Sequence, residues 1–169
     1  MAFISEALNE QHTTRRFDSS QPALVTWLQQ HALTTEARRT GRTFIWQDNG
    51  QVVGYYTIAA HLIVREELPK AIGRGNPGQI PAVLLARLAL DKTLHGQGLG
   101  GALLADALER IVIATRVVAA RFVVVDAIDQ GAHGFYRHHG FREIPGTMRL
   151  IQKIGDIAAA LEPDPPPPR

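Results

Sequence analysis

The chain has 169 residues, of which 45% are hydrophobic and 20% are charged. A chain of this length and apolar content can bury a full core in one domain, which excludes a large multidomain machine and a globally disordered protein. It has no cysteine. Disulfides, thiolate metal sites and a cysteine nucleophile are therefore excluded, and the composition fits a reducing compartment.

The charge is close to balanced, with 18 basic and 16 acidic residues and a net charge of +2 at pH 7. Of the 18 basic residues, 15 are arginine. Arginine suits bidentate binding of phosphate, but the nucleotide composition of a gene can produce the same excess. The excess of arginine is therefore compatible with a polyanionic partner but does not by itself indicate one.

No segment reads as a membrane span or a secretion signal. Arg87, Arg116 and Arg121 interrupt the longest apolar runs. The first six residues lack the basic start and long apolar core of a signal peptide. We therefore expect a cytoplasmic protein without a membrane partner.

The first third of the chain predicts two helices and a hairpin. Residues up to about 14 are polar and without pattern. A helix is expected to begin near Ser20, a plausible cap, with Pro22 in its first turn, and a second helical stretch covers 35–39. Strands are expected at 43–46 and 52–60, joined by an Asp-Asn-Gly turn at 48–50.

The middle of the chain changes character. Residues 65–81 are rich in proline and glycine and predict a long loop, with a short helix near 66–70. A continuous apolar run at 82–90 predicts a central strand. A glycine loop at 95–101 follows, then a long amphipathic helix through Ile111 and a second buried strand at 122–125. These two strands are expected to be parallel.

The last third predicts a helix, a hairpin and a tail. Asp129 can cap a helix that Gly140 ends. Strands at 141–144 and 147–152 are expected to close the sheet, before a short helix near 156–161. Residues 163–169 form a proline-rich tail, expected to be disordered, so that residues 1–162 make a single domain.

The glycine loop predicts an anion site. Free backbone amides and the dipole at a helix N-terminus both favour negative charge. Five positions follow that design: Gly96, Gly98, Leu99, Gly100 and Gly101. A ligand-free tight turn would need one or two glycines rather than four.

Two known phosphate-binding motifs are similar to this loop. Residues 96–101 fit the dinucleotide fingerprint G-x-G-x-x-G, and Asp126 ends the next strand, where a ribose-binding acid would lie. Only 43 residues follow Asp126, too few to complete a doubly wound sheet, so a nicotinamide dinucleotide is a remote alternative. A Walker A loop is excluded, because no Gly-Lys-Ser/Thr follows.

The order of elements and two motifs resemble the GNAT superfamily of acetyl-CoA-dependent N-acetyltransferases. That family's pyrophosphate motif is Gln/Arg-x-x-Gly-x-Gly/Ala, and residues 95–100 match it except that His95 takes the first position. Downstream stands Phe135-Tyr136-x-x-x-Gly140-Phe141. The resemblance implies an α/β fold with a mixed, mostly antiparallel twisted sheet flanked by helices, in which a central parallel strand pair forms the acetyl-CoA cleft.

Several segments within 17–153 are also similar to the acetyltransferase toxins of bacterial type II toxin–antitoxin modules, among them 42–44, 53–56, 80–91 and 125–129. This resemblance implies acetylation of the α-amine of aminoacyl-tRNA, a block of translation, a ribbon-helix-helix antitoxin as partner, and a possible homodimer. The alternatives are an N-acetyltransferase of a small-molecule amine or of a protein N-terminus or lysine, and a non-catalytic CoA-binding or antitoxin-binding module.

The resemblance also assigns roles to residues. Tyr136 is the candidate general acid at the cofactor sulfur, although Phe135 and Tyr136 can equally form a packed aromatic pair. The cofactor-binding set it implies is Leu88, Ala89, Leu90, His95, Gly96, Gln97, Gly98, Leu99, Gly100, Gly101 and Tyr136.

A general base is left unassigned among Asp126, Asp129, His133, His138 and His139, since solvent can suffice for an amine that titrates near neutrality. Two basic clusters are candidates for tRNA contact or simply solvated surfaces: Arg15, Arg16, Arg38, Arg39 and Arg42, and Arg137, His138 and Arg142. No His-x-x-x-His pair with a carboxylate suggests a metal site, and we expect none.

Overall fold

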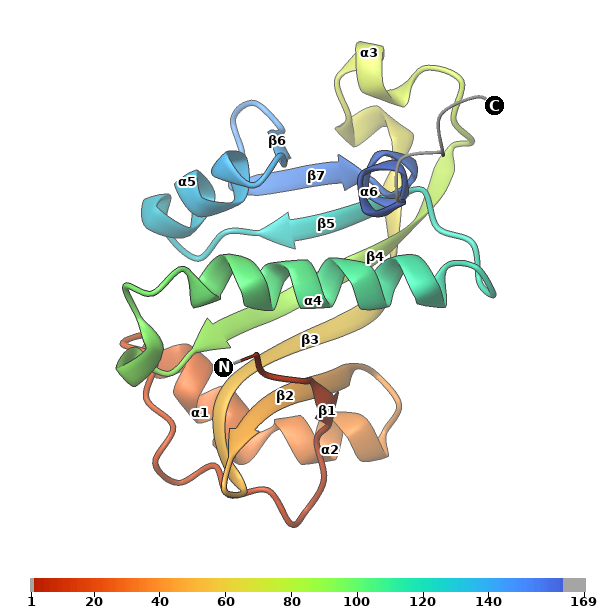
Figure 1. Ribbon diagram of the computed structural model, residues 1–169. Coiled ribbons are helices and arrows are strands. Elements are labelled where there is room, and N and C mark those ends of the chain that lie inside the picture. The colour runs from red at the N-terminus through yellow and green to blue at the C-terminus, as the bar shows by residue number, and fades with distance from the viewer. Residues whose placement is uncertain (1, 163–169) are drawn as a thin grey trace, which may run out of the picture. The chain divides into compact units, whose positions relative to one another are not determined.

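The computed structural model describes residues 2–162 (Figure 1). The proline-rich tail that the sequence predicts at 163–169 lies outside the described residues. The helices and strands, in chain order, are β1 (Glu6–Ala7), α1 (Pro22–Gln30), α2 (Ala32–Ala37), β2 (Arg42–Asp48), β3 (Gln51–Val64), the 3₁₀ turn η1 (Arg65–Glu67), α3 (Lys70–Gly73), β4 (Gln79–Leu90), the 3₁₀ turn η2 (Lys92–Leu94), α4 (Leu99–Ala114), β5 (Phe122–Asp126), α5 (Gln130–His138), β6 (Arg142–Glu143), β7 (Arg149–Lys153) and α6 (Ile154–Leu161).

The strands form one sheet in the order β1-β2-β3-β4-β5-β7-β6. The pairs β1–β2, β2–β3, β5–β7 and β6–β7 are antiparallel, and β4 and β5 are neighbours in this order. The predicted fold class, a mixed and mostly antiparallel sheet with flanking helices, is confirmed. Contacts divide the chain into two compact units: the first is the chain up to His61 with Val83–Ala107, and the second is Leu62–Ala82 with the chain from Leu108 on.

The first unit has a core built on β3 and the two early helices. Phe17, Leu28, Ile45 and Tyr55 are among its buried side chains, and the Tyr55 hydroxyl donates a hydrogen bond to the Leu24 carbonyl at 2.6 Å. This bond satisfies the polar end of a buried aromatic residue. It fastens α1 to the middle of the sheet.

Helix α4 is fastened to the same unit by one carboxylate. Asp106 accepts hydrogen bonds from Ser5 Oγ at 2.6 Å, from the Tyr56 hydroxyl at 2.7 Å and from Trp46 Nε1 at 3.2 Å. Three donors from the N-terminal segment, β3 and β2 therefore converge on the helix. This network fastens the N-terminal half of α4 to the first unit.

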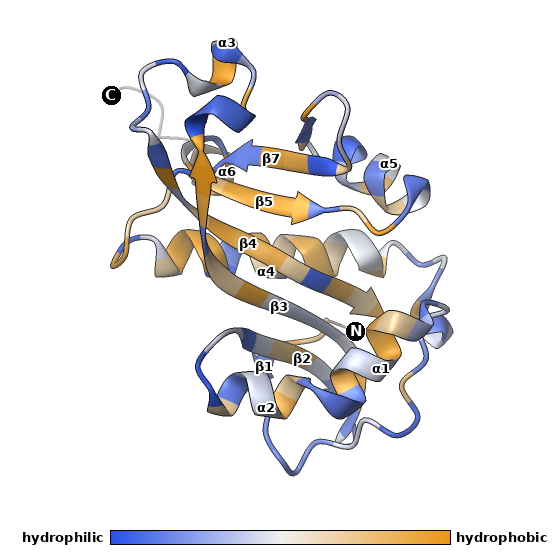
Figure 2. Ribbon diagram, turned by 180° about the vertical axis from the view of Figure 1, so that it is seen from behind, coloured by the Kyte–Doolittle hydropathy of each residue, from blue (hydrophilic) through white to orange (hydrophobic). Residues whose placement is uncertain are grey.

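The second unit packs around β5, whose residues Phe122–Val125 are all buried. Figure 2 shows this strand as apolar along its length, as expected for a strand covered on both faces. β7 lies beside it in an unbroken antiparallel register from Phe122↔Lys153 to Asp126↔Arg149. Helix α6 begins directly after β7 and buries Ile154 and Ile157.

The predicted start of the first helix is wrong by one residue. Gln21 is the N-cap of α1, and Ser20 has a left-handed φ of +70°. Asp18 explains the difference, because its side chain accepts the Ser20 N–H at 3.1 Å and turns the chain before the helix starts. Pro22 is in the first turn, as predicted.

Other boundaries differ where a tertiary contact extends or starts an element. Residues 6–7, which lie in the polar segment without a sequence pattern, form β1 by pairing with β2. Helix α2 begins at Ala32, three residues before the predicted stretch. The predicted loop at 65–81 contains η1 and α3, and β4 already begins at Gln79. None of the helices in the described residues is long and apolar enough to cross a membrane.

Candidate active site

The loop before α4 has the backbone of an anion site. Gly96 and Gly98 have left-handed φ values of +76° and +74°, a conformation that favours glycine. A Cβ built on either residue would meet no atom within 4 Å. The space beside this loop is therefore open, and the first amides of α4, from Leu99 on, have no acceptor within the helix. Such a loop, followed by a helix N-terminus, favours a phosphate.

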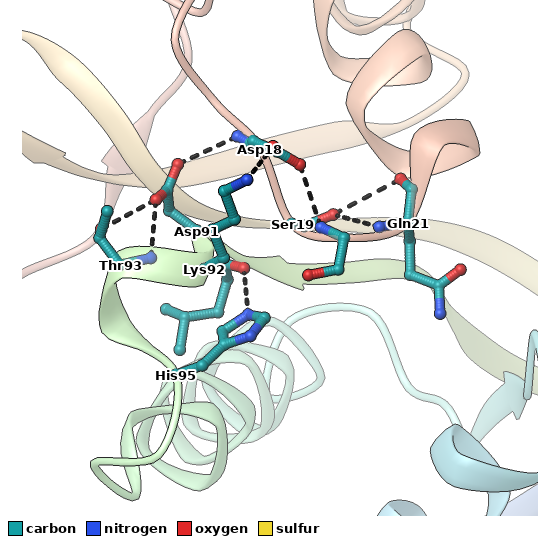
Figure 3. A network of polar contacts seen from close by, with 9 residues as sticks. Asp18, Ser19, Gln21, Asp91, Lys92, Thr93 and His95 are labelled. Carbon is teal, nitrogen blue, oxygen red and sulfur yellow. Dashed lines mark hydrogen bonds and ion pairs between the residues drawn. The ribbon is translucent and has the colours of Figure 1, made fainter.

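Asp91 organises the chain that leads into this loop (Figure 3). One carboxylate oxygen accepts from the Thr93 N–H at 3.0 Å and the Thr93 hydroxyl at 2.8 Å, and the other accepts from the Asp18 N–H at 3.0 Å. Asp18 in turn pairs with Lys92 at 2.7 Å. The Lys92 ammonium lowers the pKa of the Asp18 carboxyl. Asp91 is not among the predicted site residues, although an Asp two residues before a Thr at a strand end is a turn signal.

His95, the departure from the family motif, turns back to the end of β4. Its Nε2 lies 2.8 Å from the Leu90 carbonyl, so this nitrogen carries the proton and donates it. Its backbone N–H donates to the Lys92 carbonyl at 3.2 Å. The side chain therefore links the end of β4 to the start of the glycine loop, and the predicted cofactor-binding residues Leu90 and His95 are in direct contact. Leu88 and Ala89 precede them on β4.

Tyr136 lies on α5, which is capped at both ends as the sequence predicts. The Asp129 side chain accepts the Ala132 N–H at 2.8 Å, and Gly140 follows the helix with a φ of +94°. The Phe141 N–H donates to the Tyr136 carbonyl at 3.1 Å and the Gly140 N–H donates to the Arg137 carbonyl at 3.1 Å. These two bonds form a Schellman motif.

The side chains of that motif hold the tyrosine ring. Phe141 packs edge-on against Tyr136 with ring centroids 5.5 Å apart, which is the apolar contact typical of a Schellman motif. Phe135 packs against the same ring at 5.3 Å. The spacing Phe-Tyr-x-x-x-Gly-Phe thus has a structural reason: the glycine ends the helix and the second phenylalanine fixes the tyrosine.

The Tyr136 ring is buried, with 8% of the residue exposed, and burial raises the pKa of its hydroxyl well above the ordinary value. The hydroxyl makes no hydrogen bond within residues 2–162. Its oxygen is not fully enclosed by these residues. It is therefore protonated at neutral pH and available to a ligand. Aromatic packing and a proton-donor role are both compatible with this arrangement.

The candidates for a general base have different surroundings. Asp126 forms a bidentate ion pair with Arg149, with distances of 2.8 and 2.9 Å, and Asp129 caps α5. His133 Nε2 lies 3.5 Å from a carboxylate oxygen of Glu143. Burial, together with the neighbouring His138, lowers the pKa of His139, whose ring packs on Phe135. Both aspartates thus have structural roles, and no base is assigned.

The two predicted basic clusters remain exposed. Arg42 pairs with Glu36 at 2.7 Å. Arg38 follows α2 as its C-cap, and Arg39 has a φ of +60°. The Gln29 side chain of α1 donates a hydrogen bond to the Arg15 carbonyl at 3.4 Å. The remaining members lie in exposed positions, Arg16 before α1, Arg137 and His138 in the last turn of α5 and Arg142 on β6.

Comparison with known proteins decides the family. The model of the acetyltransferase (GNAT) domain matches residues 39–143. The chain belongs to the GNAT acetyltransferases. The predicted family and enzyme class are confirmed, and the dinucleotide alternative is overturned, since the sheet order is also not that of a doubly wound fold.

Three relatives narrow the comparison within the GNAT family. The tRNA-acetylating toxin of Mycobacterium tuberculosis (strain ATCC 25618 / H37Rv) is 35% identical over 146 residues, covering 86% of this chain and 88% of the relative. The structure of AtaT complexed with acetyl-methionyl-tRNAfMet is 29% identical with a TM-score of 0.87, covering 95% of this chain and 100% of that one. A tyrosine-to-phenylalanine mutant of the AtaT toxin, bound to the C-terminus of the antitoxin AtaR and to acetyl-CoA, is 28% identical with a TM-score of 0.82, covering 95% and 99%.

The glycine loop fits the cofactor of this family. Gly96 and Gly98 leave open space where a side chain would stand, and α4 presents the amides of its first turn at the end of the loop. A pyrophosphate needs such donors and such room. The predicted acetyl-CoA cofactor is confirmed for the GNAT family by the acetyl-CoA-bound relative.

Proposed function

We propose that this chain transfers the acetyl group of acetyl-CoA to the α-amine of aminoacyl-tRNA and so blocks translation. The single observation that carries the proposal is the similarity over nearly the whole chain to a tRNA-acetylating toxin, 35% identical across 86% of the residues. The glycine loop and the protonated Tyr136 hydroxyl supply the chemical groups that acetyl transfer requires.

The first unit holds the cofactor. The amides from Gly96 through Gly101 bind the pyrophosphate, and His95 keeps the loop against the end of β4. Leu88, Ala89 and Leu90 offer backbone groups to the pantetheine arm, and Gln97 lies in the loop with its side chain donating to the Thr93 carbonyl at 3.3 Å. When bound, acetyl-CoA supplies an acetyl group activated as a thioester.

Tyr136 serves as the proton donor for the sulfur that leaves. Its raised pKa keeps the proton on the phenol oxygen, and general acids of this kind contribute about 10²–10⁴-fold to rate. The acceptor amine needs no base of its own in the protein, because an α-amine has a pKa of about 7.7–8.0 and is substantially neutral near physiological pH.

We infer two kinds of macromolecular partner. The exposed arginines Arg15, Arg16, Arg38, Arg39 and Arg42, and the group Arg137, His138 and Arg142, are proposed to contact tRNA phosphates. A ribbon-helix-helix antitoxin is proposed on the analogy of AtaR, which binds the AtaT toxin through its C-terminus. A homodimer and a cytoplasmic location are further parts of this proposal. Light scattering of the purified protein tests the dimer, and co-purification with the product of the neighbouring reading frame tests the antitoxin.

The function is tested by incubating the protein with labelled acetyl-CoA and total aminoacyl-tRNA, with free amines and peptides in parallel. Label is expected on tRNA and should be lost when the aminoacyl ester is hydrolysed. Label on small amines or peptides alone would contradict the proposal and support the alternative N-acetyltransferase. Tyr136→Phe is the matched control, because it keeps the ring that packs on Phe135 and Phe141.

A further inference from the structure

A cavity of about 400 Å³ opens in the second unit beside β7. Its wall is built from four separate segments: α3 with the residue after it, the approach to β5, the β6 strand, and the junction of β7 with α6. Both views place α3 over the end of β7 from which α6 begins (Figures 1 and 2). No residue of the predicted cofactor-binding set lines this cavity.

Positive charge dominates the wall. Arg74, Arg121, Arg142 and Lys153 line the cavity, and Asp156 is the one acidic residue there. All four cations are exposed, and none of them forms an ion pair within residues 2–162. Four uncompensated cations around one hollow create a positive potential that favours a polyanion.

Arg149, at the other end of the same strand, is by contrast paired. It begins the strand that Lys153 ends, and its guanidinium is held by Asp126 in a bidentate ion pair. At the end of β5 that carries Asp126, the positive charge of Arg149 is therefore balanced by a carboxylate. At the Phe122 end, the cations of the cavity have no such partner within residues 2–162.

The backbone fixes the cationic positions. The Arg121 N–H donates to the Pro81 carbonyl at 2.8 Å, and the Arg121 carbonyl accepts from the Ile154 N–H at 2.9 Å. Lys153 stands opposite Phe122, and Arg142 stands opposite Ile151 in the β6–β7 ladder. Arg142 and Lys153 are thus presented from paired strands and Arg121 from a backbone held by hydrogen bonds on both sides, which lowers the entropy lost when a ligand binds.

We propose that this cavity binds the phosphodiester backbone of the tRNA substrate. Three arginines supply planar forks that match phosphate oxygens. Because the cations come from four separate segments, they suit successive phosphates of a strand better than one isolated ion. The identity of the RNA rests on the proposed function, whereas the binding of a phosphodiester chain rests on the cavity itself.

The cavity is also connected to the helix of the proposed proton donor. Gly140 lies in its wall and closes the Schellman motif that holds Tyr136. Phosphates bound here would contact the segment that ends α5. Of the eight basic residues that the sequence suggested for tRNA, only Arg142 lies in this wall, and Arg74, Arg121 and Lys153 were not predicted.

The test compares binding of uncharged total tRNA to the wild-type chain and to a double variant, Arg121→Gln with Lys153→Gln. The variant is expected to bind tRNA roughly tenfold or more weakly, and the slope of log Kd against log salt should fall by about 1.5, as the loss of two phosphate contacts predicts. Acetyl-CoA binding and the thermal midpoint should not change. The control is Arg116→Gln, which replaces an exposed arginine outside this wall. It should change the tRNA affinity less than about twofold, because it removes none of the proposed phosphate contacts.

Equal tRNA affinity and equal salt slope in the double variant would overturn the proposal, as would an equal loss in Arg116→Gln. A polyglutamate peptide that bound the cavity as tightly as tRNA, with the same loss in the double variant, would overturn the choice of RNA. Should Gln at these positions reduce stability, the single change Arg142→Lys, which keeps the charge and removes the fork, must still weaken tRNA binding. Because the assay uses uncharged tRNA, it detects the cavity's role even where no acetyl transfer occurs.

Discussion

Tyr136 combines a buried ring with a hydroxyl that makes no hydrogen bond within residues 2–162. Replacing it by phenylalanine keeps the contacts with Phe135 and Phe141. We expect Tyr136→Phe to reduce kcat by roughly 10²-fold or more, with little change in acetyl-CoA affinity or in the thermal midpoint. Turnover equal to that of the wild type would show that the tyrosine only packs.

The pH dependence of the same residue provides a second test. Burial raises the pKa of the phenol, so the proton needed for donation is lost only above the ordinary value near 10. The rate should rise with pH through about 7.7–8.0, as the acceptor amine loses its proton, and should not fall again before about pH 10. The measurement is a pH profile of kcat/KM for the wild type and for Tyr136→Phe. A fall in kcat/KM that begins near pH 8 in the wild type and is absent in Tyr136→Phe would contradict this role.

At the scale of elements, Gly140 is the position that α5 requires. Its φ of +94° costs a side-chain-bearing residue about 1–2 kcal/mol, and a Cβ there would also approach Gln152 Nε2 to 3.2 Å. Gly140→Ala should therefore lower the free energy of unfolding by about that amount and lower kcat more than it raises KM, because the Schellman motif also holds Tyr136.

The matched control for Gly140 lies in the same helix. Gly134 is inside α5 and a Cβ on it would meet nothing within 4 Å. Gly134→Ala should stabilise the protein by about 0.5–1 kcal/mol, since alanine is the better helix former. Chemical denaturation measures both variants, and a loss of stability in both would reject the conformational explanation.

Asp91 holds the chain that leads into the glycine loop, as Gly140 ends the helix that carries Tyr136. Asp91→Ala leaves the Asp18 and Thr93 amides without an acceptor, and we expect a loss of about 2–4 kcal/mol together with weaker acetyl-CoA binding. Asp91→Asn keeps one acceptor oxygen for Thr93 and should lose clearly less. Calorimetric titration with CoA and urea denaturation provide the two readouts. Equal effects of the two variants would argue against the hydrogen bonds seen at Asp91.

These elements also show what the sequence can predict. Asp129, Gly140 and the glycine loop were recognised because caps and turns depend on residues close in sequence. The bond between the Asp18 amide and Asp91 joins residues 73 apart, and the cations of the cavity come from four segments. Contacts of that kind depend on the folded chain, which is why Asp91 and Arg121 were missed and the start of α1 was misplaced by one residue.

At the scale of the whole molecule, the chemistry is divided between segments far apart in the chain. The glycine loop lies in the first unit and Tyr136 in the second. The family model identifies an acetyltransferase, whereas the proposed acceptor rests on the similarity to relatives alone.

Mass spectrometry of the tRNA product identifies the acceptor. Purified protein is incubated with acetyl-CoA and total aminoacyl-tRNA, the RNA is digested by nuclease, and the terminal aminoacyl-adenosines are examined by mass spectrometry. We expect N-acetylated aminoacyl-adenosine with the wild-type chain and far less with Tyr136→Phe. Unmodified aminoacyl-adenosines, under conditions where the same preparation acetylates free amines, would show that aminoacyl-tRNA is not the acceptor.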